Sequence, residues 1–159
     1  MDKKKIFYGL SLVFFVVTLV LWFTVDAIVS KNSASATTTF MSLTFGDEIS
    51  LGIFGTLGMK FSFLNFLVLP FALGATALAA FKVVEKPKKK KRKAQSSKLA
   101  AFGLFALGIV ITVLILLVRN LAVLTHDGLL DNFKLTTSAI IVAMLAGIAG
   151  LSAVAAEII

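Results

Sequence analysis

Four long apolar stretches, separated by shorter polar segments, dominate the pattern of the chain. They span about residues 6–25, 61–81, 99–118 and 135–157. A helix rises about 1.5 Å per residue, so about 20 apolar residues are needed to cross a hydrocarbon core about 30 Å thick. Lipid offers no hydrogen-bonding partners, and a helix satisfies its own backbone groups. The pattern therefore predicts an all-α membrane protein, a single domain built as a bundle of four transmembrane helices.

A period-two alternation marks the segment 30–60, the largest region between the apolar stretches. The runs 41–45 and 49–53 place an apolar residue at every second position, which is typical of strands with one apolar face. Turn-forming residues, Gly46 and Asp47, lie between the two runs. The pattern predicts a small β-hairpin in this loop, and an irregular loop or a short interfacial helix is the alternative.

Basic residues are unevenly placed, and their placement predicts the orientation of the chain. Of the 16 Lys and Arg residues, three precede the first stretch and nine lie in the segment 82–98. Because Lys and Arg close to membrane spans stay in the cytoplasm, we expect both termini and the basic loop 82–98 to be cytoplasmic. The expected location is the cell membrane. The first stretch exceeds the apolar length of a secretory signal, about 7–15 residues, so we expect it to be retained.

The densest part of the basic loop is a run of six consecutive residues: Lys88, Lys89, Lys90, Lys91, Arg92 and Lys93. This run fixes the topology, and it also favours contact with anionic lipid headgroups, at about 1 kcal/mol for each basic residue near the surface. No aromatic residues are interleaved in the run to stack on bases, so binding of nucleic acid is not expected.

Small residues in two of the stretches predict close helix packing. Ala139, Ala143 and Gly147 recur every four residues in the fourth stretch, and Ala146 and Gly150 form a neighbouring row. The second stretch holds a similar set: Ala72, Gly74, Ala75, Ala77, Ala79 and Ala80. In lipid, small residues allow helix backbones to approach each other. We therefore expect the second and fourth helices to pack tightly, within the bundle or across an interface to another subunit.

Three further features concern single residues. Pro70 lies in the middle of the second stretch and predicts a kink in that helix. Asn65 is the most polar residue within a stretch and is expected to form a hydrogen bond across helices. Asp26 and Arg119 end the first and third stretches at the same depth, which suggests an ion pair at the outer interface, with two separately solvated end residues as the alternative.

Composition narrows the function classes. The chain is 58% hydrophobic and 15% charged, against about 25% charged in a typical soluble domain. It contains no cysteine, so disulfides and thiolate metal sites are excluded, and its single histidine, His126, has no accompanying ligand pattern. No ionisable residue lies in the middle of a stretch. Membrane enzymes and ion-coupled transporters depend on such residues, so we expect neither an enzyme nor a cofactor.

The remaining interpretation is a non-catalytic membrane subunit that acts by docking to other membrane proteins or to itself. A small oligomeric channel or facilitator is one alternative, and a protein that binds anionic lipid through its basic loop is another. Four spans with a larger first outer loop are similar in layout to claudin-type tetraspan proteins. The outer-loop signature of that family needs a Trp and two cysteines, and neither occurs in the loop 30–60.

Overall fold

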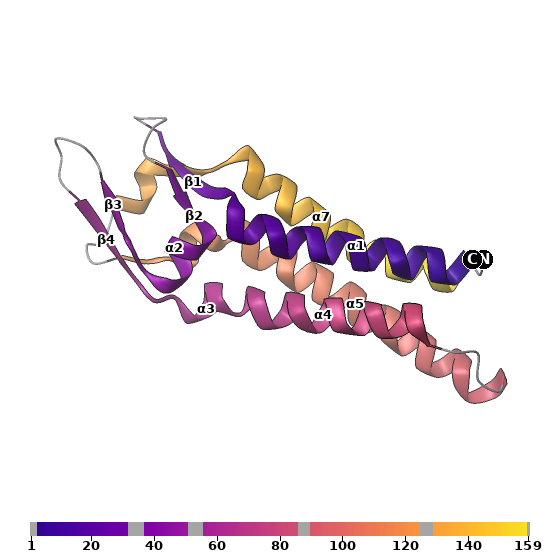
Figure 1. The fold of residues 1–159 in the computed structure, drawn as a ribbon. Coiled ribbons are helices and arrows are strands. Elements are labelled where there is room, and N and C mark those ends of the chain that lie inside the picture. The colour runs from indigo at the N-terminus through magenta and orange to yellow at the C-terminus, as the bar shows by residue number, and fades with distance from the viewer. Residues whose placement is uncertain (1–2, 32–36, 51–55, 86–89, 125–128, 159) are drawn as a thin grey trace.

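The computed structural model describes residues 3–31, 37–50, 56–85, 90–124 and 129–158. Long helices lie side by side, with both chain termini at one end of the bundle and short strands at the other (Figure 1). We call these the terminal end and the β end. Four helical segments are long and apolar enough to cross a membrane: Lys3–Thr24, Phe63–Val84, Ser96–Leu116 and Thr137–Ile158. The described residues thus contain four long apolar helices, in agreement with the number of stretches that the sequence predicts.

The helices form a ring in which each contacts two neighbours. Helix α1 (Lys3–Thr24) contacts α4 (Val68–Val84) and α7 (Thr137–Ile158), and α5 (Lys90–Leu116) also contacts both of these. The second and fourth spans therefore lie at opposite corners, so the expectation that they pack on each other within the bundle is wrong. The small residues of α7 face α5 instead, where the Thr112 hydroxyl donates to the Ala143 carbonyl oxygen at 3.0 Å.

The buried positions follow a heptad spacing. In α1 they alternate at steps of three and four residues: Tyr8, Ser11, Phe15, Thr18 and Trp22. The same spacing occurs in α4: Val68, Ala72, Ala75, Ala79 and Lys82. A repeat averaging 3.5 residues keeps one face toward the partner helices when they supercoil with a left-handed twist. On α4 the buried positions are mostly small, whereas on α1 they include the large aromatic side chains of Tyr8, Phe15 and Trp22.

The predicted packing residues of the fourth span are mostly inside. Ala139, Ala143, Ala146 and Gly150 are buried in α7. Gly147 is half-buried, and a Cβ atom added there would lie 3.4 Å from the Thr112 hydroxyl oxygen. These residues therefore bring α7 close to α5.

The second span is divided near Pro70. A short helix, α3 (Phe63–Phe66), is separated from α4 by Leu67, and Pro70 is the third residue of α4. Proline has no N–H group to offer the carbonyl of Phe66, four residues earlier. The break in the span therefore lies one turn before Pro70, next to the Phe66 carbonyl that lacks a hydrogen bond from residue 70.

Two small antiparallel sheets form the β end, and each joins the first loop to the second. One has the strand order β2-β1-β6 and the other β3-β4-β5. The strands are β1 (Asp26–Ser30), β2 (Thr37–Thr39), β3 (Glu48–Ser50), β4 (Thr56–Lys60), β5 (Val123–Leu124) and β6 (Phe133–Leu135). Short helices connect them: α2 (Phe40–Phe45), α6 (Val118–Leu121) and the 3₁₀ helix η2 (Leu129–Asn132).

The predicted hairpin is wrong in its strands. Residues 40–45 form the helix α2, because the Thr39 hydroxyl accepts a hydrogen bond from the Ser42 amide at 3.2 Å and caps it. The observed pairing joins β3 to β4, with Glu48 opposite Gly58. Residues 51–55, part of the second expected strand, lie outside the described residues. Gly46 ends α2 with φ +89°, and an added Cβ atom there would lie 2.7 Å from the Met59 carbonyl oxygen.

The basic loop 82–98 is shorter in the structure than the sequence suggests. Lys82 lies in α4, and α5 begins at Lys90, so that Lys90, Lys91, Arg92 and Lys93 open this helix. Lys88 and Lys89 lie outside the described residues. Lys, Arg, Ala and Gln are strong helix formers, which explains why the helix continues beyond its apolar part.

Candidate functional site

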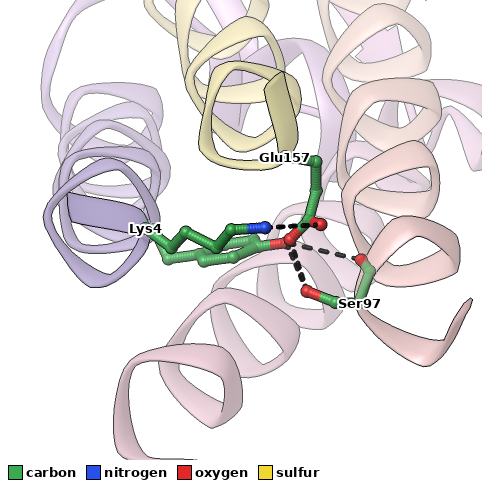
Figure 2. Close-up of polar contacts among 4 residues, drawn as sticks. Lys4, Ser97 and Glu157 are labelled. Carbon is green, nitrogen blue, oxygen red and sulfur yellow. Dashed lines mark hydrogen bonds and ion pairs between the residues drawn. The ribbon is translucent and has the colours of Figure 1, made fainter. Parts of the chain in front are cut away.

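A polar cluster closes the terminal end of the bundle. Glu157 of α7 accepts hydrogen bonds through Oε1 from the Tyr8 hydroxyl, at 2.9 Å, and from the Ser97 hydroxyl. Its Oε2 atom lies 3.2 Å from the Lys4 ammonium. Figure 2 shows Lys4, Ser97 and Glu157 pointing toward one another from three different helices. The Glu157 side chain is only 10% exposed, so these donors replace the water that a carboxylate at this depth lacks.

A second ion pair lies at the same end of the bundle. The Lys82 ammonium is 2.8 Å from Glu85 Oε2, and the Lys82 side chain is 5% exposed. The ammonium also lies 6.0 Å from the centre of the Phe81 ring. The sequence places Lys82 in the solvated basic loop, whereas the structure includes it in the interior of the bundle.

A partly open pocket of about 230 Å³ adjoins the polar cluster. Residues of α5 and α7 line it: Lys98, Ala101, Phe102, Val154, Glu157 and Ile158. The pocket is smaller than the roughly 300–1,000 Å³ of sites that enclose drug-sized ligands. Its lining is apolar except for one ammonium and one carboxylate, a combination that suits part of an amphiphile and not a polar substrate.

At the β end, the structure gives Arg119 a different partner from the predicted one. Arg119 donates to the Phe133 carbonyl oxygen at 2.9 Å, and its second terminal nitrogen lies 3.6 Å from Asp131 Oδ1. Asp26 instead takes part through its backbone, since its carbonyl oxygen accepts from the Thr136 hydroxyl at 2.5 Å. Among the described ion pairs, none joins Asp26 to Arg119. Arg119 therefore connects α6 to β6.

Asn65 is confirmed as a residue that connects elements. Its side chain is 1% exposed, and its amide nitrogen donates to the carbonyl oxygens of Leu43 and Val118, both at 3.3 Å. Ser62, which caps α3, donates to the Leu121 carbonyl oxygen at 2.6 Å. These bonds fix the short helices α2 and α6 of the β end to the start of the second span.

The small residues of the second span divide between two faces of α4. Ala72, Ala75 and Ala79 are fully buried, whereas Gly74 and Ala77 are exposed. A Cβ atom added at Gly74 would have no atom of the described chain within 4 Å. The part of the predicted packing set that includes Gly74 therefore contacts none of the other described helices.

An exposed aromatic cluster lies at the β end, near the start of the second span. Phe45, Phe61 and Phe66 lie with ring centres 5.8–6.2 Å apart. Phe45 is 46% exposed and Phe61 50% exposed. Phe63, in the first turn of the span, is also exposed. Exposed contiguous apolar side chains on this scale mark contact surfaces for protein or membrane.

The described residues contain no group of three or more His, Asp or Glu that could hold a metal ion. His126 lies outside the part of the chain that the structure describes. No protein-family model matches the chain, and comparison with curated proteins and with solved structures finds no similar protein.

Proposed function

We propose that this chain is a non-catalytic membrane subunit that docks, through the outward face of α4, onto a transmembrane helix of another chain. The observation that carries the proposal is the uncovered pair Gly74 and Ala77. Large apolar side chains are satisfied by lipid tails, whereas small residues let a second backbone approach closely. Much of the outward face of α1, by comparison, consists of large side chains such as Val13 and Val20.

The docking face has the geometry of a helix-packing seam. Pro70, Gly74, Ala77 and Phe81 are all exposed, and they are spaced four, three and four residues apart. Residues at such spacings lie on one side of a helix. The two small residues lie between the larger Pro70 and Phe81 on this face, and the 3.5-residue period fits a left-handed crossing of about 20°. The partner is a helix of a different membrane protein or a second copy of this chain.

A channel is supported less well by the same structure. Interior hydroxyls of Thr18, Thr76 and Ser152 each donate to the carbonyl oxygen four residues earlier in their own helix. Large side chains such as Phe15 and Trp22 fill the bundle axis and are buried. A pore between several copies needs polar outward faces, and the described outward faces of the spans are apolar.

The proposed location is the cell membrane, with the terminal end in the cytoplasm. Both termini lie at the end where α5 begins with its basic residues (Figure 1). Because the chain has no cysteine, single cysteines can report the orientation. On intact cells, a membrane-impermeant thiol reagent is expected to label Lys134→Cys at the β end and to leave Lys93→Cys unlabelled until the cells are permeabilised. The reverse labelling would contradict this orientation.

Docking is tested by enlarging the small residues. We expect Gly74→Leu and Ala77→Leu to abolish the association, measured by energy transfer between tagged copies in membranes and by the membrane proteins that copurify in mild detergent. Gly9→Leu is the matched control, because a Cβ atom at Gly9 of α1 also meets nothing within 4 Å. The proposal is wrong if the wild type is monomeric without a partner, or if association survives both α4 variants.

A further inference from the structure

We infer that the pocket between α5 and α7 binds one anionic phospholipid from the leaflet at the terminal end. Lys98 contacts the headgroup phosphate, and part of one acyl chain lies against the apolar wall. This site is separate from the docking face of α4 and does not depend on it.

The depth of the pocket matches the boundary between headgroups and hydrocarbon. Lys98 is the third residue of the span-forming segment Ser96–Leu116, and Glu157 is the second-to-last residue of α7. A lysine at this depth extends its ammonium toward the headgroups while its methylene groups stay in the apolar region. The pocket therefore meets a lipid where phosphate and acyl chain join.

The walls of the pocket suit an acyl chain. Ala101 is buried and forms its floor, and Val154 is half-buried. Phe102 and Ile158 stand at the rim and are 64% and 80% exposed. A volume of about 230 Å³, open on one side, accommodates a segment of one flexible chain without enclosing a whole ligand.

The charges around the pocket select an anion. Glu157 is the only acidic lining residue, and its carboxylate is already engaged by Lys4, Tyr8 and Ser97. Lys98 is exposed and forms no ion pair with a described residue. The basic residues at 90–93 precede it by about two turns in the same helix. With respect to the part of the chain that the structure describes, Lys98 is thus an unpaired cation beside a carboxylate that already has its donors, which favours an anionic headgroup over a zwitterionic one.

The inference is tested by the lipid retained on the purified full-length protein. The protein is reconstituted into phosphatidylcholine bilayers with a minor fraction of phosphatidylglycerol, and bound lipid is counted by native mass spectrometry. We expect about one tightly bound phosphatidylglycerol, with affinity reduced about fivefold by Lys98→Gln and strongly reduced by Val154→Phe, which fills the pocket. Lys134→Gln, at the β end, is the matched control and leaves retention unchanged.

Each remaining outcome decides against the site. Equal retention of phosphatidylcholine would remove the charge argument. Unchanged retention in both Lys98→Gln and Val154→Phe would overturn the pocket, even if replacing the run 88–93 by Gln abolished binding, because the run alone would then hold the lipid. Lys98→Gln changes an exposed side chain, so it keeps the test decisive if Val154→Phe fails to fold.

Discussion

Gly108 of α5 lies so close to Gly150 of α7 that a Cβ atom added to Gly108 would stand 3.0 Å from the Gly150 Cα atom. The same added atom would lie 2.8 Å from the Ala146 carbonyl oxygen. In the other direction, a Cβ atom at Gly150 would meet the Phe105 Cα atom at 3.1 Å. Backbone atoms cannot move aside as a flexible side chain can. The third and fourth spans can therefore pack this closely only because Gly108 and Gly150 have no side chains.

The first prediction follows from this contact. Gly108→Ala is expected to lower the free energy of unfolding by about 1–3 kcal/mol, because the added methyl group forces the two backbones apart. Gly74→Ala is the matched control and is expected to be neutral or stabilising, by up to about 1 kcal/mol, since alanine favours helix and meets no neighbour. The measurement is equilibrium unfolding in mixed micelles. Equal effects of the two substitutions would contradict the close backbone contact between α5 and α7 at Gly108.

Which helices would be neighbours could not be predicted, although the number of spans could. The number of spans follows from the lengths of the four apolar stretches, since a stretch that crosses lipid must satisfy its backbone as a helix. Small residues occur in the second, third and fourth spans, so their presence does not say which pair meets. Gly108 was not singled out, although a glycine inside an apolar stretch is itself a signal for close helix packing.

The β end was predicted only in part, for two physical reasons. The sequence of residues 40–45 is compatible with both a strand and a short helix. The signal for the helix was Thr39, because threonine is a residue type favoured as an N-cap. Strands of two to five residues that pair across separate loops, such as β1 with β6, leave too little periodicity to read.

The polar cluster at the terminal end was also missed. Tyr8 and Glu157 are 149 positions apart, and a sequence pattern cannot show that their side chains meet.

The second prediction concerns this cluster. Glu157→Ala leaves the buried Tyr8 hydroxyl without its shortest hydrogen bond, and such a loss costs about 1–3 kcal/mol. A double-mutant cycle with Tyr8→Phe isolates the pair. We expect a coupling energy of at least about 0.5 kcal/mol, measured by unfolding in micelles. A coupling energy of zero would mean that the two groups do not interact.

The third prediction is a pH dependence at the β end. The Glu48 amide donates to Asp47 Oδ1 at 2.8 Å and the Ser42 hydroxyl donates to Oδ2 at 2.9 Å, which lowers the pKa of Asp47 below its ordinary value of 3.8. Because the folded pKa is the lower one, the stabilisation is complete above the ordinary value and is lost as the pH falls through the folded pKa.

The check is an NMR titration of the Asp47 carboxyl carbon. We expect a midpoint below that of an exposed aspartate, and an upward shift in Ser42→Ala, where one of the two donors is lost. Asp47→Asn is expected to remove this part of the acid dependence of stability. An ordinary midpoint, or one that Ser42→Ala leaves in place, would contradict the turn geometry.

The central claim, that the outward face of α4 meets another helix, is tested most directly by cross-linking in native membranes. A photoreactive cross-linker is attached to a single cysteine at Ala77→Cys on α4 or at Val13→Cys on the outward face of α1, in a chain that otherwise has none. We predict a discrete protein adduct from the α4 position and lipid products alone from the α1 position. No protein adduct at Ala77→Cys, or the same adducts from both positions, would contradict the claim.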